Sequence, residues 1–254
     1  MIRISARIAN SLWLPALLML LWLVVSAHSS SIYFPPLTNI LSQFRKDWIF
    51  ANIGKDVVPS VRNLLLGFIL ASISGVVLGL VIGLLPTLGK AVSPVIHFLR
   101  AIPPPILLPL AAVLLGLGTS MKVVMIAFGG VWPTLISTID ATLSVDPVVL
   151  DTARAYHIPL WTRLRRIVLP QASPRIAAGL RTSLQLCIFM VVVSEMFASK
   201  GGLGFFVLDA EQTFAIKQLW SGILMLGLLG IVANSAFSFF ESRILRWYFM
   251  SQNK

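Results

Sequence analysis

Long uncharged runs alternate with short polar segments along the chain, and this pattern predicts helices that cross a membrane. A helix that spans a bilayer needs roughly 20 mostly apolar residues. The predicted spans are residues 12–27, 63–85, 101–121, 123–143, 176–198 and 219–240. They indicate an all-α integral membrane protein with about six transmembrane helices. Residues 1–254 are expected to form a single transmembrane domain whose core spans lie within 63–240.

The first run is the shortest and can be interpreted in two ways. It follows Arg3 and Arg7, and Val25-Ser26-Ala27 at its end resembles a processing site, as in a cleavable signal peptide. An uncleaved extra N-terminal span at residues 12–27 agrees better with the further spans downstream. We expect the second interpretation to hold.

Glycine and proline mark two of the other runs. Gly75, Gly79 and Gly83 repeat at helical spacing in the second span, which would let a neighbouring helix approach closely. The third run begins with Pro103-Pro104-Pro105. Because proline removes backbone donors, this span is expected to be irregular or kinked.

Composition supports lipid as the main solvent of the chain. Of its 254 residues, 57% are hydrophobic and 11% are charged, whereas soluble domains carry roughly a quarter charged residues. The formal net charge is +11, and the basic residues sit in short clusters between apolar runs. This arrangement is typical of the positive-inside rule and argues against a nucleic-acid-binding protein.

The distribution of basic residues predicts the orientation of the chain. Thirteen Lys and Arg, with Lys90 and Arg100 among them, lie in segments on the same side as the N-terminus, against seven on the other side. The rule therefore places both termini in the cytoplasm.

The largest predicted inner loop is residues 144–175, and it contains a short helix. Asp146-Pro147 reads as an N-cap followed by proline at the first helical position. The helix should run over residues 148–157 and end before Pro159. Leu160, Trp161 and the apolar positions after them then predict a second helix, which lies along the inner membrane surface beside its arginines. Taken alone, the loop could equally be a solvated basic connector.

The spacing of residues within this loop carries a resemblance. Asp151-Thr152-Ala153 is followed after three residues by His157, and nine residues later by Ile167-Val168-Leu169-Pro170. This resembles the signature loop of the permease family of binding-protein-dependent ABC importers, where Glu-Ala-Ala, Gly and Ile-x-Leu-Pro stand at the same spacing. His157 replaces the family's glycine, which puts the local backbone geometry in question.

Further short motifs extend the resemblance to the nitrate/sulfonate/taurine branch of this family, from about Phe34 to Trp247. They are Arg100-Ala-Ile-Pro103-Pro104, Gly116-Leu-Gly118 with Lys122, Val145-Asp146-Pro147, Gly179-Leu180-Arg181, Ser194-Glu195-Met196 and Gly202-Leu203-Gly204. Several spaced motifs together are more specific than any one of them.

The resemblance implies a five-helix type I permease core, and an importer subunit of the bacterial inner membrane. Its partners would be a dimer of ABC ATPase subunits that bind ATP and Mg, a second permease copy, membrane lipid, and a periplasmic or lipid-anchored solute-binding protein. The solute would be a sulfonate, taurine, nitrate or a related small molecule. The ATPase-coupling residues carried over by position are Asp151, Thr152, Ala153, Arg154, His157, Leu169 and Pro170. A bulky charged residue at Ala153 is expected to prevent docking without unfolding the permease.

The chain itself offers no recognisable site for ATP, a cofactor or a metal. Gly83-Leu-Leu-Pro-Thr-Leu-Gly89-Lys90 has one residue too many between its glycines for a phosphate loop, and Ala91 replaces the required Ser or Thr. Three His and one Cys, Cys187, leave no credible catalytic or metal constellation for a membrane enzyme. A nucleotide-independent secondary transporter or channel remains the alternative function.

Three residues are candidates for the translocation pathway. Glu195 is an acidic group near the outer end of the fifth span, where such groups are often functional, although headgroups or solvent could also hydrate it. Asn234 could line the pathway or, like Gln185, make interhelical hydrogen bonds. Arg100 could attract an anion or act as an inner charge that anchors the topology.

Overall fold

The computed structural model describes residues 2–27, 31–50 and 52–252, and these residues form helices without any strand. In chain order the elements are α1 (Ile2–Ala27), α2 (Leu37–Phe50), η1 (Ile53–Val57), α3 (Val58–Leu84), α4 (Pro86–Ala101), η2 (Pro104–Leu107), α5 (Leu108–Leu115), α6 (Thr119–Leu143), α7 (Pro147–Ala155), α8 (Leu160–Arg163), η3 (Leu164–Val168), α9 (Leu169–Ala198), α10 (Leu203–Gln212), α11 (Ile216–Ile244) and α12 (Arg246–Gln252). The prediction of an all-α protein is confirmed for the described residues.

Four continuous helices in the described part are long and apolar enough to cross a membrane. They run over Ile53–Leu84, Thr119–Leu143, Leu160–Phe197 and Ile216–Ile244. They correspond to the predicted second, fourth, fifth and sixth spans. The first run lies in α1, in which Ala16–Ala27 forms an apolar helical stretch.

The third predicted span is bent, as expected, but its boundaries were wrong. It is the pair Pro86–Ala101 and Pro104–Leu115, whose two halves meet at 83°. The bend falls at Pro103–Pro105, where proline withholds the backbone donors that would continue the helix. The helical part of this region therefore begins at Pro86, and Arg100 lies at the end of α4 rather than in a loop.

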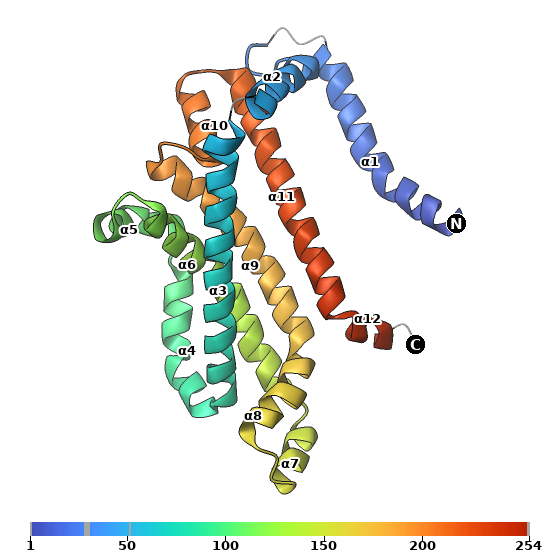
Figure 1. The fold of residues 1–254 in the computed structure, drawn as a ribbon, viewed down its shortest axis with the longest axis vertical. Coiled ribbons are helices and arrows are strands. Elements are labelled where there is room, and N and C mark those ends of the chain that lie inside the picture. The colour runs from blue at the N-terminus through green and yellow to red at the C-terminus, as the bar shows by residue number, and fades with distance from the viewer. Residues whose placement is uncertain (1, 28–30, 51, 253–254) are drawn as a thin grey trace.

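The centre of the bundle is the packing of α6 between α3 and α9, which make its most extensive contacts (Figure 1). The small-residue stripe of α3 lies in this interface, as predicted. A Cβ added to Gly75 would lie 2.8 Å from Thr134 Cβ, and one added to Gly79 would lie 2.6 Å from Thr138 Cβ. Only glycine allows the two helices to approach this closely.

Helix α11 is held to the bundle near its first turns by α2. Trp48 of α2 is buried, and its Nε1 donates to Ser221 Oγ at 2.9 Å. Helix α1 instead leans away from the bundle (Figure 1), and contacts it through Trp22, which packs 5.5 Å from the ring of Trp220. The predicted long outer segment is therefore partly helical, which the apolar pattern did not reveal.

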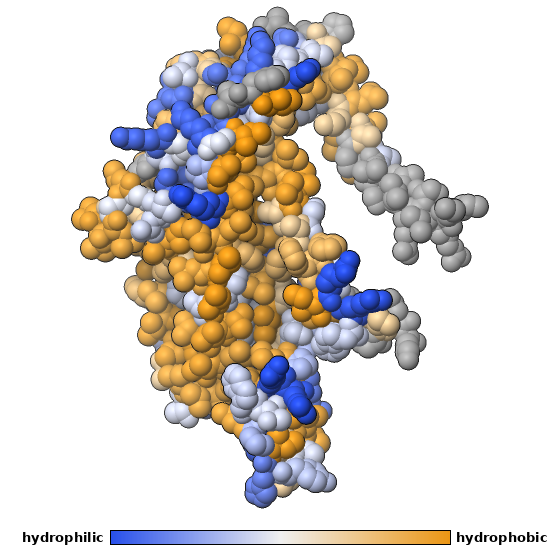
Figure 2. All heavy atoms as spheres, in the orientation of Figure 1, coloured by the Kyte–Doolittle hydropathy of each residue, from blue (hydrophilic) through white to orange (hydrophobic). Residues whose placement is uncertain are grey.

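Side-chain hydropathy divides the surface into three zones. Figure 2 shows hydrophobic residues covering the middle of the molecule, with hydrophilic residues gathered over α2 and α10 at one end and over α7 and α8 at the other. We call these the α10 end and the α7 end. An apolar band between two polar ends is the surface expected of a protein embedded in a bilayer.

Candidate functional site

The α7 end carries a separate short helix that is capped as the sequence predicted. Asp146 is the N-cap of α7, and its Oδ1 accepts a hydrogen bond from Val148 N at 2.8 Å. Pro147 occupies the first helical position, where its missing N–H has no intrahelical partner to lose. The helix ends at Ala155, two residues earlier than predicted.

His157 ends α7 in the left-handed backbone conformation that glycine usually supplies. Its φ is 50°, and Tyr156 is the C-cap. Ile158 N donates to Ala153 O and His157 N donates to Arg154 O, both at 2.9 Å. These two bonds define a Schellman motif with histidine at its left-handed position. The replacement of glycine therefore leaves the turn geometry intact.

One residue of α7 is buried, while most side chains of α7 and α8 are exposed or half-buried. Ala153 is 2% exposed, so its methyl group packs within this chain and is not available to a partner. The charged substitution expected from the sequence to block docking would instead disturb this packing. Asp151, Thr152 and Arg154 are exposed, and Arg154 pairs with Asp151 at 2.8 Å.

Large apolar side chains are also exposed at the α7 end, on a tip formed by α7, its C-cap and α8. Val148 is 70% exposed, Tyr156 is 78% exposed and Trp161 is 71% exposed. They belong to α7, its C-cap and α8, which are the elements of the polar α7 end (Figure 2). A cluster of this kind on a polar end of a molecule is typical of a protein–protein contact site.

The stretch after α7 does not form a separate helix on the membrane surface. α8, η3 and α9 are one continuous helix over Leu160–Phe197, so the predicted surface helix is wrong. Leu164–Val168 makes a π-turn in which Leu169 N donates to Leu164 O. Because Pro170 has no N–H, the α-helical bond to Arg166 O is absent there, and the wider turn accommodates the gap. Leu169 and Pro170 therefore lie within this continuous helix, which leads from the α7 end into the bundle.

A second polar group of residues lies at the α10 end, where Glu195 caps the start of α10. Glu195 is 0% exposed, so hydration by solvent or headgroups is not what holds its carboxylate. Its Oε2 accepts from Ser60 Oγ at 2.7 Å and from Gly204 N at 3.1 Å. Asn63 Nδ2 donates to its Oε1 at 3.4 Å.

Two further caps complete what we call the Glu195 cluster, formed by Asp56, Ser60, Asn63 and Glu195 around the first turn of α10. Gly202 N donates to Asp56 Oδ1 at 3.0 Å, and Leu203 N donates to Ser60 Oγ at 2.8 Å. Three successive backbone donors, those of the N-cap Gly202 and of the first two residues of α10, are thus satisfied by side chains from η1, α3 and α9.

Close contact explains the two glycines at this helix start. Gly202 has φ 108°, and a Cβ placed on it would lie 2.5 Å from Glu195 Cδ. Gly204 is packed against the backbone of Val192. Sequence reasoning found Glu195 but missed Asp56, Ser60 and Asn63, although Gly202-Leu203-Gly204 was a signal for a tight backbone approach.

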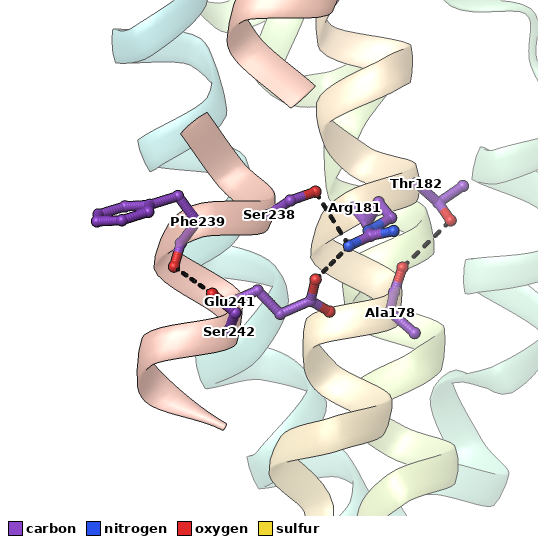
Figure 3. A network of polar contacts seen from close by, with 7 residues as sticks. All are labelled: Ala178, Arg181, Thr182, Ser238, Phe239, Glu241 and Ser242. Atoms are coloured by element: carbon purple, nitrogen blue, oxygen red, sulfur yellow. Dashed lines mark hydrogen bonds and ion pairs between the residues drawn. The ribbon is translucent and has the colours of Figure 1, made fainter. Parts of the chain in front are cut away.

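A polar network also ties α9 to α11 (Figure 3). Arg181 of α9 forms an ion pair with Glu241 and donates a hydrogen bond to Ser238 Oγ at 3.3 Å, both partners being on α11. Its guanidinium also lies 6.0 Å from the centre of the Phe237 ring. The contacts that α11 makes with the bundle thus include a fixed charge pair near its last turns.

The remaining pathway candidates are not brought together with Glu195. Asn234 and Gln185 are exposed, and neither makes a hydrogen bond with any described residue, so the interhelical bonds expected of them are not found within this chain. Arg100 is exposed at the end of α4 and lines a cavity with residues of α6 and α9. The pathway role of these three residues stays a prediction.

The segment that superficially resembles a phosphate loop is the turn between two helices. Gly83 and Leu84 end α3, and α4 begins at Pro86 and includes Gly89 and Lys90. Among the described residues no strand precedes it. A phosphate loop is formed between a strand and a helix, so this segment lacks the necessary context.

Comparison with known proteins adds a family and several relatives. Residues 75–246 match the family model described as binding-protein-dependent transport system inner membrane component. A protein named as an aliphatic sulfonates transport permease, SsuC of Bacillus subtilis, is 26% identical over 241 residues, which cover 94% of this chain and 87% of that protein. The taurine transport system permease protein TauC of Escherichia coli is 25% identical over 252 residues, 96% of this chain and 92% of TauC. The nitrate import permease protein NrtB of Synechococcus elongatus is 26% identical over 224 residues, 83% of this chain and 80% of NrtB.

Solved structures agree on the fold. An inward-facing MetNI methionine ABC transporter contains a chain with a TM-score of 0.59 and 23% identity, covering 75% of this chain and 94% of that one. An amino acid ABC transporter with histidines gives a TM-score of 0.57 and 21% identity, covering 82% of this chain and 97% of that one. At this level of identity the likeness concerns the type I fold alone.

Proposed function

The chain belongs to the family of binding-protein-dependent transport system inner membrane components, and as a permease of this family we propose that it moves a small anion into the cytoplasm at the expense of ATP. The solute would arrive on a periplasmic or lipid-anchored binding protein. A second permease copy would complete the pathway. The membrane would be a bacterial inner membrane.

The exposed apolar tip at the α7 end is the observation that carries this proposal. Val148 and the C-cap residue Tyr156 are exposed on α7, which is capped at both ends, and Trp161 is exposed on α8 directly after it. We assign them, with Asp151, Thr152, Arg154 and His157, to the contact with an ATPase subunit. Ala153 would support the contact from within, by packing α7 onto its own chain.

The helices joined to the tip offer a mechanical route for ATP-driven movement. The tip follows α6 directly and continues through Leu169 and Pro170 into α9, and α6 packs between α3 and α9. Movement of the tip would therefore shift packed helices as a rigid body rather than bend a loop. ATP and Mg would be bound by the ATPase dimer, and this chain would have no enzymatic activity of its own.

Three relatives support an anionic solute. Their names specify aliphatic sulfonates, taurine and nitrate, and each carries a negatively charged oxoanion group. We therefore propose that the solute of this chain is a sulfonate, taurine, nitrate or a related small molecule. The positive-inside distribution supports an orientation with both termini and the α7 end in the cytoplasm.

The test compares two tyrosines at opposite ends of the molecule. Tyr156→Asp places a charge in the proposed ATPase contact, and Tyr33→Asp places the same charge on an exposed tyrosine beyond the other end. With the ATPase and binding protein co-expressed, Tyr156→Asp should strongly reduce both ATPase co-purification and solute uptake. Tyr33→Asp should leave ATPase co-purification unchanged. Unchanged co-purification in Tyr156→Asp, or uptake that continues in ATP-depleted cells, would refute the proposal.

A further inference from the structure

A cavity opens midway along the bundle at the point where the third span bends. Its volume is about 570 Å³, and its walls come from the end of α4, the middle of α6 and the middle of α9. Arg100 is the one charged residue among those that line it, and Trp132, Phe189 and Met190 are among its apolar residues. The Glu195 cluster and the α7 end share no lining residue with this cavity.

Arg100 lies at a depth where an arginine without a partner is energetically unfavourable. It follows the start of α4 by 14 residues, which corresponds to about 21 Å along a helix. Trp132, which lines the same cavity, lies 13 residues into α6, again about 20 Å from a helix end. An arginine near the centre of a bilayer costs about 2.5–3.5 kcal/mol on insertion scales. Such residues normally face a partner or a water-filled cavity.

Arg100 has no partner within the part of the chain that the structure describes. It is exposed, and no hydrogen bond or ion pair with another described residue involves it. Arg181, the other arginine deep in a span, is in contrast paired with Glu241. Since Arg100 lies in the last turn of α4, its charge is favourable beside the helix C-terminus, but that interaction leaves the guanidinium donors free.

The apolar residues that line the cavity favour an anion that carries an organic tail. Trp132 and Phe189 provide apolar surface beside the guanidinium, and the indole N–H of Trp132 is buried without an acceptor among the described residues. The volume lies within the usual range of pockets for small organic ligands, and it exceeds what a bare oxoanion would fill. A lipid headgroup does not fit this depth, because headgroups lie about 15 Å from the centre of the bilayer.

We propose that this cavity is an intramembrane binding site for an organic oxoanion, in which Arg100 binds the anionic head and Trp132 and Phe189 contact a short apolar tail. The inference rests on the proposed function, and it assigns the solute a stopping point inside the membrane in addition to the binding protein. A guanidinium suits this task because its planar donors can bind two oxygens of a sulfonate or carboxylate at once.

The test measures binding of radiolabelled 1-hexanesulfonate to the full chain in nanodiscs, without the binding protein. Arg100→Gln should weaken this binding at least about tenfold, and Arg100→Lys, which keeps the charge, should weaken it less. Phe189→Ala should weaken hexanesulfonate more than ethanesulfonate, because only the longer tail reaches the removed ring. Arg243→Gln, at an exposed arginine outside the cavity, serves as the matched control and should bind as the unaltered chain does.

Three results would overturn the site: no binding of hexanesulfonate by the unaltered chain, equal binding by Arg100→Gln, or equal competition by 1-hexanol, which lacks the charge. Each variant is first checked for a single monodisperse peak, and Arg100→Lys replaces Arg100→Gln in the comparison if the latter does not fold. Co-purification of the ATPase with unaltered chain is measured in parallel. Failure of co-purification contradicts the proposed function, whereas failure of binding alone contradicts only this site.

Discussion

Two residues with side chains, His157 and Phe214, occupy backbone conformations that usually belong to glycine. Their φ angles are 50° and 53°, and each lies just beyond the end of a short helix, α7 and α10. Phe214 N donates to Glu211 O and Ala215 N donates to Ala210 O, the same pair of bonds that closes α7. The left-handed conformation costs an L-residue roughly 1–2 kcal/mol. At both turns the hydrogen bonds of the helix end maintain it.

The first prediction concerns His157. His157→Gly removes the strain while keeping the Schellman bonds, so ATPase co-purification should be unchanged. His157→Val places a β-branched side chain at positive φ, where it is a genuine outlier, and the tip should loosen. The measurement is the rate of protease cleavage between residues 147 and 163, together with co-purification. Slower cleavage in the valine variant than in the glycine variant would contradict this account.

The second prediction concerns the buried carboxylate of Glu195. Glu195→Ala leaves the donors of Asn63 and Gly204 without their acceptor, whereas the Ser60 hydroxyl keeps Asp56 O. Each unsatisfied buried group costs about 1–3 kcal/mol. Glu195→Gln keeps one acceptor oxygen, so its loss of stability should be smaller. Thermal midpoints in detergent should rank the unaltered chain first, the glutamine variant second and the alanine variant last.

The exposed Glu211 provides the matched control for this ranking. Glu211→Gln removes the same charge at the other end of α10 and should leave the midpoint within experimental error. A midpoint for Glu195→Ala equal to that of the control would mean that the carboxylate does not stabilise the start of α10.

At the scale of elements, α3 and α6 pack closely along a stripe of small residues. Gly75, Gly79 and Gly83 of α3 face Thr134, Thr138 and Thr142 of α6 at successive turns. The hydroxyls of Thr138 and Thr142 donate to carbonyls one turn back in their own helix, at 2.6 and 2.8 Å. Thr134 Oγ1 is buried without a partner among the described residues. The interface is therefore built from small groups, and two of its three threonine hydroxyls are satisfied within α6.

The third prediction tests this interface with a pair of identical substitutions. Gly79→Ala places a methyl group 2.6 Å from Thr138 Cβ, so α3 and α6 must separate and the thermal midpoint should fall. Gly227→Ala in α11 meets nothing within 4 Å, and alanine's helix propensity is about 1 kcal/mol better, so its midpoint should stay or rise. Changes of the same sign in both variants would contradict the close contact.

The elements that the sequence predicted are those whose signal is local. Long, mostly apolar runs predicted α3, α6, α9 and α11, and the Asp146-Pro147 pair predicted the start of α7. Helix α4 was missed because Lys90 and Arg100 leave only nine uncharged residues between them, with Pro94 in the middle. The Glu195 cluster depends on residues far apart in the chain, since Ser60 and Glu195 are separated by 135 positions. No spacing rule could bring those two together.

At the scale of the whole molecule, the two polar ends differ in charge as well as in shape. The α7 end carries Arg154, Arg163, Arg165 and Arg166 on a narrow tip, and the opposite end is the broader group of α2 and α10 (Figure 1). Asp47, Asp56, Glu195, Asp209 and Glu211 lie toward the α10 end, where the seven Lys and Arg of the predicted outer side lie as well. The four arginines at the α7 end therefore favour a cytoplasmic position for the tip, and the α10 end would face the periplasm.

The fourth prediction tests this orientation with the help of the chain's one cysteine. Cys187 is fully buried in α9. An impermeant maleimide therefore does not reach its thiol, and the native cysteine gives no background labelling. After Cys187→Ser as a further precaution, Gln212→Cys at the end of α10 should react in intact spheroplasts. Thr152→Cys on α7 should react only after the membrane is permeabilised. Both positions are exposed, so a difference between them reports the side of the membrane rather than burial. The opposite pattern would place the arginine-bearing tip outside, where no cytoplasmic ATPase could reach it, and the importer mechanism would fail together with the orientation.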